Sequence, residues 1–342
     1  MKMKYCYFCR QIKSFQMRIA VTGANGHVGL NLCKSLHEAG HQVNAFTHKN
    51  DSGIASIPVN HFKGDILNRQ SMLPFLKDVD VVFHLAARIS ITGDHDGIVT
   101  RTNGEGTRNI LKLATECGVK RFIHFSSIHA FQQQPRDMPL DESRPLVGLE
   151  GFAYDRSKAT GERAVVEAAS NGLDTVILSP TAIIGPVDPQ PSLVGKAIID
   201  LYNHKIPSLV PGGYDWVDVR DVVSAAISAI EKGRKGEKYL LSGHWHSLKE
   251  FSSLIEHHSK RKIVKTILPI WLARFGLPFI SMYSKISKTE PLYTSESLTI
   301  ITEGSRKISN AKAQAELDFN PRPLSDTISD MLVWLRENKN LN

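Results

Sequence analysis

The feature that most constrains the fold is a regular alternation of short apolar runs with helical patterns over the first 180 residues. Such alternation is typical of a parallel sheet whose strands are joined by crossover helices. Several runs are apolar at consecutive positions, as expected for strands covered on both faces. The predicted strands are 18–22, 42–47, 60–63, 79–85, 121–126 and 174–178, and the predicted helices are 27–39, 70–76, 104–117 and 154–170. The sequence therefore predicts an α/β fold with a doubly wound parallel sheet.

After Pro180 the pattern changes, because prolines and glycines recur at 185–186, 189, 191 and 211–213 and indicate turns rather than strands. Helical patterns return at 219–231, 247–258, 269–284, 309–317 and 325–336, with one short strand at 238–241. We expect residues 181–342 to supply the last strand of the sheet and a smaller, mostly helical lobe that binds the substrate. Residues 1–16 precede the first strand-like run and are predicted to be a disordered tail, with natural translation starting at Met17.

Composition places the chain among ordinary globular proteins, with 42% hydrophobic and 22% charged residues. The formal charge is +8, but Lys2, Lys4, Arg10 and Lys13 supply four of these charges within the predicted tail. The remainder is only mildly basic, so no nucleic-acid partner is predicted. The absence of an apolar leader and the presence of only four cysteines favour a reducing, cytoplasmic location.

Two residue pairs have the spacing of metal ligands. Cys6 and Cys9 form one pair, and His244 and His246 form the other. A zinc site needs a second pair of ligands, and none with suitable spacing accompanies either one. We therefore predict no metal and interpret the histidines as part of a surface loop.

The most apolar stretch of the chain is 263–283. Lys265, Pro269, Arg274 and Pro278 interrupt it, so it does not qualify as a transmembrane span. We interpret it as a buried segment of the substrate lobe rather than a helix on a membrane surface. Its aromatic residues (Trp271, Phe275 and Phe279) suggest a bulky or lipophilic small-molecule substrate.

A glycine-rich turn, Thr22-Gly23-Ala24-Asn25-Gly26-His27-Val28-Gly29, follows the first predicted strand and opens a helix. Gly23 permits a tight turn, Gly26 lets the backbone approach a pyrophosphate, and Gly29 lets the helix pack closely on the strand. The helix N-terminus offers free N–H groups and the positive end of the helix dipole to phosphates. This context predicts that residues 17–180 form a Rossmann-type domain that binds a dinucleotide.

The end of the second predicted strand bears on the choice between NAD and NADP. An acidic residue there accepts hydrogen bonds from the adenosine ribose in NAD enzymes. This chain reads Phe46-Thr47-His48-Lys49, with no carboxylate before Asp51. Because His48 and Lys49 can neutralise a 2′-phosphate, the sequence favours NADP(H), with NAD(H) as the alternative.

Tyr154 and Lys158 are four residues apart on a predicted helix, and this spacing puts both side chains on one face. An ammonium group beside a phenol favours the phenolate and lowers its pKa. Such a pair suits a general acid/base that acts on a hydroxyl or carbonyl group.

These landmarks, in this order, resemble the extended short-chain dehydrogenase/reductase superfamily of the NAD-dependent epimerase/dehydratase type, over nearly the whole chain from Met17. The matching segments are the glycine-rich turn, Gly64-Asp65-Ile66, Val82-Phe83-His84-Leu85-Ala86-Ala87, Thr102-Asn103-Gly104, Phe125-Ser126-Ser127, Tyr154 to Lys158 and Ser179-Pro180. Within the superfamily, the chain most closely resembles the dihydroflavonol-4-reductase-like and 3β-hydroxysteroid-dehydrogenase-like branch. Three features favour this branch: the lack of an acidic residue after the second strand, the run 216–222 and the run 319–324.

The resemblance implies a site for the cofactor and a reaction. The implied cofactor-binding residues are Gly23, Asn25, Gly26, His27, Val28, His48, Lys49, Asp65, Ile66, Leu85, Ala86, Ala87, Asn103, Pro180 and Ile183, together with Tyr154 and Lys158. Tyr154 would donate a proton to a ketone that accepts hydride, and Ser127, rather than Ser126, would hold the ketone oxygen. Lys158 would lower the pKa of Tyr154 and contact the nicotinamide ribose. Family members often form homodimers through the helices expected near 104–117 and 154–170.

We expect an NADP(H)-dependent oxidoreductase that interconverts a ketone or aldehyde and an alcohol. Two alternatives remain open at this point. One is an NAD-dependent nucleotide-sugar epimerase, and the other is an NADP-binding regulator without catalysis. The intact set of Ser127, Tyr154 and Lys158 speaks against the regulator, because a sensor does not need a positioned acid. Asn103 is expected to support a helix start near the site, with a role in proton relay left open.

Overall fold

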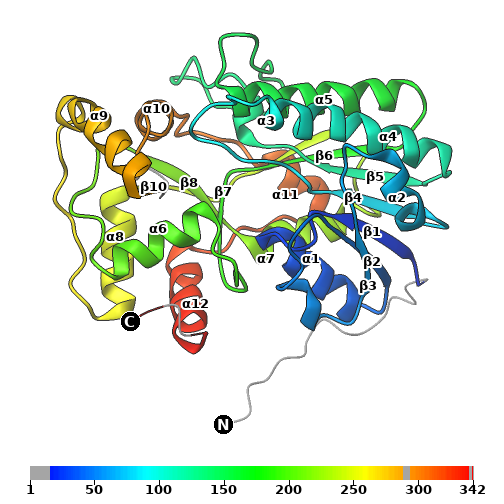
Figure 1. The fold of residues 1–342 in the computed structure, drawn as a ribbon, viewed down its shortest axis with the longest axis horizontal. Coiled ribbons are helices and arrows are strands. Elements are labelled where there is room, and N and C mark those ends of the chain that lie inside the picture. The colour runs from blue at the N-terminus through cyan, green and yellow to red at the C-terminus, as the bar shows by residue number, and fades with distance from the viewer. Residues whose placement is uncertain (1–15, 288–292, 339–340, 342) are drawn as a thin grey trace.

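A computed structural model describes residues 16–287, 293–338 and 341 (Figure 1). Within these residues, seven parallel strands form one sheet in the order β3-β2-β1-β4-β5-β6-β9. A smaller sheet has the order β10-β8-β7. The predicted tail and its Cys6–Cys9 pair lie outside the described residues. The strands are β1 (Arg18–Thr22), β2 (Gln42–Thr47), β3 (Asn60–Lys63), β4 (Val81–His84), β5 (Arg121–Phe125), β6 (Thr175–Pro180), β7 (Ala182–Ile184), β8 (Gly213–Asp218), β9 (Lys238–Leu241) and β10 (His244–Ser247).

Helices cover both faces of the main sheet, as Figure 1 shows. The α-helices are α1 (His27–Glu38), α2 (Arg69–Leu76), α3 (Ile98–Thr100), α4 (Thr107–Glu116), α5 (Ala153–Ser170), α6 (Leu193–Tyr202), α7 (Val219–Ser228), α8 (Leu248–Ser259), α9 (Ile270–Ser287), α10 (Ser295–Glu303), α11 (Ala311–Leu317) and α12 (Leu324–Glu337). Two 3₁₀ helices are η1 (Ile54–Ser56) and η3 (Ile128–Ala130), and η2 (Arg101–Gly106) is a π-helical segment.

The two faces of the sheet have separate cores. Along β1, Ile19 and Val21 join the core formed with α1, α7 and α11, whereas Ala20 joins the core formed with α2, α4 and α5. Successive side chains of a strand point to opposite faces, so this division follows directly from the pleat. The consecutive apolar residues seen in the sequence are therefore explained, and the predicted Rossmann-type doubly wound fold is confirmed.

One helix begins earlier than predicted. We expected a helix over 104–117, but the helical run starts with α3 at Ile98, continues through the π-helical turn η2 and ends with α4 at Glu116. Asn103 consequently lies inside the helical run and does not support its start. The wider turn brings the Asn103 carbonyl within reach of the Thr107 hydroxyl, which donates a hydrogen bond to it at 2.7 Å.

The region after Pro180 contains more regular structure than its prolines and glycines indicated. Strands β7, β8 and β10 and helices α6 and α10 were not predicted. His244 and His246 lie in β10, which pairs antiparallel with β8, so the prediction of a loop there was wrong. These strands have between three and six residues, too few for a clear alternation of apolar and polar positions. A separate core stabilises this part of the chain, in which Trp216 stacks on Phe251 with ring centroids 4.3 Å apart.

Candidate active site

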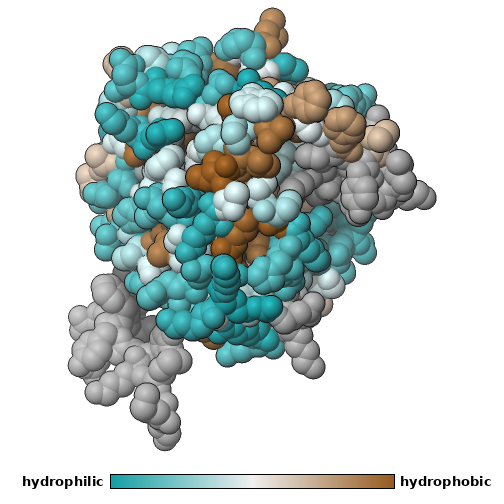
Figure 2. All heavy atoms as spheres, turned by 90° about the vertical axis from the view of Figure 1, so that its left-hand side faces the viewer, coloured by the Kyte–Doolittle hydropathy of each residue, from teal (hydrophilic) through white to brown (hydrophobic). Residues whose placement is uncertain are grey.

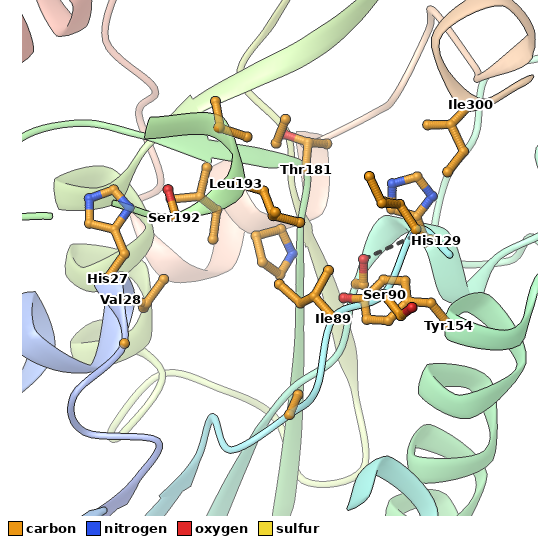
Figure 3. Close-up of a pocket in the computed structure, with 18 of the residues that line it drawn as sticks. His27, Val28, Ile89, Ser90, His129, Tyr154, Thr181, Ser192, Leu193 and Ile300 are labelled. Carbon is orange, nitrogen blue, oxygen red and sulfur yellow. Dashed lines mark hydrogen bonds between the residues drawn. The ribbon is translucent and has the colours of Figure 1, made fainter. Parts of the chain in front are cut away.

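A cavity of about 1590 Å³ opens at the carboxyl ends of the central strands, where residues after β1, β4, β5 and β6 line it. The strand order reverses direction at β1, which lies between β2 and β4. Such a switch point is where ligands bind in open α/β sheets. The volume exceeds the 300–1,000 Å³ or so typical of sites for small molecules. Figure 3 shows His27 and Val28 at one end of this cavity, with His129 and Tyr154 at the other.

The glycine-rich turn is packed too closely for larger residues. A side-chain carbon on Gly29 would lie 2.2 Å from the Gly23 carbonyl oxygen, and one on Gly23 would lie 2.8 Å from the Ala86 nitrogen. Gly23 also has a φ of 68°, in the left-handed region that favours glycine. Helix α1 then begins at His27, and its N-cap residue, Gly26, makes no side-chain hydrogen bond to the first N–H groups of the helix. Because the first N–H groups of a helix lack partners within it, this end of α1 suits a phosphate group.

Thr22 fixes the turn to the neighbouring strand. Its hydroxyl oxygen accepts hydrogen bonds from the backbone nitrogens of Leu85 and Ala86, each at 3.1 Å. The same oxygen lies 2.8 Å from Nδ1 of His84, whose Nε2 lies 3.0 Å from the Thr107 hydroxyl. Burial lowers the pKa of His84 to about 3, so this imidazole is neutral near pH 7. The predicted cofactor-binding residues included Ala86 and Ala87. The hydrogen bonds of Thr22 and His84 that hold this segment in place were not predicted.

The end of β2 has no carboxylate directed at the cavity. His48 lines the cavity and its Nε2 lies 3.8 Å from a carboxylate oxygen of Asp65, with both side chains well exposed. Asp65 is held by a hydrogen bond from the Leu67 nitrogen at 2.9 Å. The carboxylate of Asp51 lies 3.9 Å from Lys63 instead.

Nearly all the predicted site residues line this one cavity. They are Gly23, Asn25, Gly26, His27, Val28, His48, Asp65, Ile66, Leu85, Ala86, Ala87, Ser127, Tyr154, Lys158, Pro180 and Ile183. Lys49 and Asn103 are not among the residues that line it. His27 also reaches the segment after β7, where its Nε2 lies 3.2 Å from the Pro186 carbonyl oxygen.

Tyr154 lies in the first turn of α5 and meets Ser127, which follows β5. The Ser127 hydroxyl is a hydrogen-bond partner of the phenol and accepts a hydrogen bond from the His129 nitrogen at 3.2 Å. Burial raises the pKa of Tyr154 to about 12, while the bond to Ser127 acts in the opposite direction. The phenol therefore keeps its proton near pH 7 and is ready to donate it.

The Lys158 ammonium lies at the carboxyl end of β5. It donates a hydrogen bond to the Phe125 carbonyl oxygen at 2.5 Å. Burial lowers the pKa of Lys158 to about 8, against the raising influence of Glu162. The pKa of Tyr154 is raised on balance, because burial of the phenol is the largest influence on it.

The two neighbouring serines have different partners. Ser126 donates a hydrogen bond to a carboxylate oxygen of Glu162 at 2.5 Å, and the other oxygen of Glu162 lies 3.0 Å from Lys238. Ser127, by contrast, contacts Tyr154. Both serines line the cavity, and Ser127 is the one that lies beside Tyr154.

Asn103 joins two walls of the cavity from behind. Its Oδ1 accepts a hydrogen bond from the Arg88 nitrogen at 2.7 Å, and its Nδ2 donates to the Arg88 carbonyl at 2.9 Å and to the Ser157 hydroxyl at 2.8 Å. The loop after β4 is thereby tied to α5 one residue before Lys158.

A buried acidic pair next to Tyr154 was not recognised in the sequence. Burial raises the pKa of Asp155 to about 7, and the nearby carboxylate of Glu296 adds to this effect. His129 Nδ1 lies 3.8 Å from Asp155 Oδ1, and burial lowers the pKa of His129 to about 4. The His129 ring also meets the Tyr154 ring edge-on at 6.2 Å. Glu296 is 142 positions beyond Tyr154 by residue number, so no local motif could have linked the two.

Apolar side chains that are not among the predicted site residues also line the cavity. They come from the loop after β4, α6, β8 and α10 and include Ile89, Leu193, Ile198, Trp216, Ile300 and Ile301. These segments are brought together only by the tertiary fold.

Within the described residues, no three His, Cys, Asp or Glu side chains are grouped as a metal site requires. No helix in this part of the chain is both long and apolar enough to cross a bilayer.

Comparisons with known proteins agree with this geometry. The chain is 31% identical over 327 residues to a protein named sterol demethylase protein B from Methylococcus capsulatus, covering 94% of this chain and 99% of that one. It is 29% identical over 328 residues to a protein named for dihydroflavonol 4-reductase from Synechocystis, covering 92% and 94% of the two chains.

Solved structures have the same fold. The crystal structure of gox2253 superposes with a TM-score of 0.81 and 28% identity, covering 96% of this chain and 100% of that chain. The structure of MoeE5 with UDP-glucose and NAD superposes with a TM-score of 0.74 and 20% identity, covering 94% and 99%. The model of the NAD dependent epimerase/dehydratase family matches residues 19–242. The chain therefore belongs to this family of NAD(P)-binding enzymes, the extended short-chain dehydrogenases/reductases.

Proposed function

We propose that this enzyme is an NADP(H)-dependent oxidoreductase that interconverts a ketone and a secondary alcohol on a lipophilic small molecule. The observation that carries the proposal is the contact between Ser127 and a protonated Tyr154 in the same cavity that the glycine-rich turn and many apolar side chains line. A bound nicotinamide would supply hydride to the substrate carbon. Tyr154 gives its proton to the substrate oxygen during reduction, and the raised pKa of the phenol keeps that proton in place at neutral pH until the substrate oxygen takes it.

Ser127 and Lys158 position the reaction. The Ser127 hydroxyl holds the substrate oxygen beside the phenol. Lys158, fixed on the Phe125 carbonyl, keeps further N–H groups that would hold the ribose hydroxyls of the cofactor. At neutral pH its ammonium also stabilises the negative charge that develops when Tyr154 loses its proton.

The preference for NADP(H) rests on the end of β2. The Asp51 carboxylate lies near Lys63, so the end of β2 itself directs no acid at a 2′-phosphate, and the Asp65 carboxylate lies 3.8 Å from His48. His48, exposed at the cavity, would donate a hydrogen bond to that phosphate. The substrate class rests on the apolar side chains that line the cavity and on the sterol-related name of the relative that matches the chain over nearly its full length.

Two measurements separate this proposal from a nucleotide-sugar epimerase and from a regulator without catalysis. Thermal unfolding with NADPH, NADH and UDP-glucose should show the largest rise in Tm with NADPH and none with UDP-glucose, since a ligand stabilises the folded state that it binds. Oxidation of NADPH at 340 nm should then be seen with ketosteroids. Stabilisation by UDP-glucose together with retained NAD would support the epimerase, and tight NADPH binding without turnover across broad carbonyl panels would support the regulator.

A further inference from the structure

Helix α9 exposes an apolar stripe. Trp271, Phe275, Phe279 and Met282 have 68%, 69%, 61% and 58% of their surfaces exposed. Their spacing of four, four and three residues places them along one face of the helix. The interpretation of this segment as buried was therefore wrong for these residues.

The opposite side of α9 is already packed. Ile270, Ala273 and Leu277 contact a small core that contains Leu298 and Ile301 of α10. This packing accounts for one face of the helix and leaves the aromatic stripe uncovered. A helix that is apolar on two sides is normally buried on both, so the outer face indicates a second contact.

The segment 257–287, which contains α9, carries charges of one sign along the sequence. Residues 257–287 contain no aspartate or glutamate and six lysines or arginines, namely Lys260, Arg261, Lys262, Lys265, Arg274 and Lys285. Lys265 lies 2.6 Å from Glu256 and Arg274 lies 3.5 Å from Glu303, so acidic residues of other segments balance part of this charge. Figure 2, which faces the side of the molecule that carries α6, α8 and α9, shows hydrophobic side chains gathered within a largely hydrophilic surface.

The stripe continues into the cavity. Phe279 belongs to the stripe and lines the cavity, together with Tyr293, Ile300 and Ile301. Phe279 therefore belongs both to the exposed face of α9 and to the wall of the cavity.

We propose that the outer face of α9 docks on the surface of an anionic lipid bilayer. Aromatic side chains on one face of a helix, with lysine and arginine beside them, are typical of helices that lie in the interface of a membrane. Arg274, half-exposed on α9, and Lys265, partly exposed before the start of α9, would lie near anionic headgroups, whose attraction falls within about one Debye length. The further step, entry of the substrate from the bilayer past Phe279, rests on the lipophilic substrate of the proposed function, whereas docking itself does not.

The test is sedimentation of the full chain with vesicles of phosphatidylcholine alone and with vesicles that contain phosphatidylglycerol. Binding should be at least about tenfold stronger to the anionic vesicles and should weaken with salt. The double variant Trp271→Ser/Phe275→Ser should reduce binding at least about tenfold. The matched control is Met138→Ser/Leu149→Ser, which removes two exposed apolar residues outside α9 and should leave binding unchanged.

Two further readouts make the result specific. The fluorescence of Trp271 should shift to the blue with anionic vesicles, and Trp271→Phe should abolish the shift while the chain still sediments. Arg274→Glu, a charge reversal on α9 itself, should weaken binding to anionic vesicles only. The proposal would be overturned if Trp271→Ser/Phe275→Ser and the control variant sedimented equally with vesicles. It would also be overturned if the wild type did not bind vesicles but self-associated, and if Trp271→Ser/Phe275→Ser abolished that self-association. Neither outcome depends on turnover, so failure here is distinct from failure of the proposed oxidoreductase activity.

Discussion

Lys158 is hydrogen-bonded to the Phe125 carbonyl oxygen at 2.5 Å, which fixes the ammonium of α5 at the carboxyl end of β5. Ser127 is two residues beyond Phe125 and contacts Tyr154, one helical turn before Lys158. The contact between the end of β5 and the start of α5 thus fixes the relative positions of Ser127, Tyr154 and Lys158.

Lys158→Met should lower turnover about 10²-fold or more, because it removes the charge that stabilises ionised Tyr154.

The same variant should also change how the stability of the protein depends on pH. Burial gives Lys158 a folded-state pKa of about 8, below the ordinary value of 10.5. Between these values the unfolded chain binds more protons, so wild-type stability gains from this group as pH rises from about 8 to 10.5. The Tm of the variant relative to wild type should fall over that range, and a constant difference would contradict the assignment.

Ser127→Ala and Ser126→Ala should differ in kind. Ser127→Ala removes the partner of Tyr154 and should reduce kcat about 10²-fold with little change in Tm. Ser126→Ala leaves a buried oxygen of Glu162 without its donor and should cost roughly 1–3 kcal/mol of stability while keeping most of the activity. Steady-state kinetics and thermal unfolding of both variants check this, and the reverse pattern would assign the reacting group to Ser126.

Asp155→Asn should stabilise the protein at pH 8 and not at pH 4. Burial and Glu296 raise the folded-state pKa of Asp155 to about 7, while the ordinary value is 3.8. Over this window the folded state binds more protons than the unfolded chain, so stability falls as pH rises from about 4 to 7. The asparagine amide removes this loss, by an amount on the order of 2 kcal/mol at pH 8. Tm values of both proteins at pH 4, 6 and 8 give the comparison, and a pH-independent difference would contradict it.

His48→Asp should shift cofactor preference toward NADH. A carboxylate at the end of β2 repels a 2′-phosphate and accepts hydrogen bonds from ribose hydroxyls. The ratio of Kd values for NADPH and NADH should change by about tenfold or more. His61→Asp, at an exposed histidine of β3, introduces the same charge outside the cavity and should leave the ratio unchanged. An unchanged ratio in His48→Asp would remove the basis for the NADP(H) preference.

The sequence predicted the sheet and the cofactor end of the site because both depend on local patterns. Consecutive apolar residues mark buried strands, and the crowding at Gly23 and Gly29 is a property of one turn. Asn103 was misplaced because a π-helical turn leaves no clear mark in residue propensity. The strands β7, β8 and β10 are too short to show a period, and their pairing is decided by tertiary contacts.

Long-range electrostatics were also beyond the sequence. The distance of Glu296 from Asp155 along the chain conceals their interaction. Burial raises the pKa of Tyr154, where the sequence favoured a lowered value, because desolvation depends on everything packed around a group. The stripe on α9 was misread for a related reason, since an apolar helix has the same sequence pattern whether its outer face is buried or exposed.

The most direct test of the account is the turnover of Tyr154→Phe on a ketone that the wild type reduces. The variant keeps the ring and loses only the hydroxyl that donates the proton. We predict that kcat falls at least about 10²-fold while the Kd for NADPH, measured by its fluorescence, stays within about twofold. Turnover near that of the wild type on the same ketone would contradict the proposed role of Tyr154.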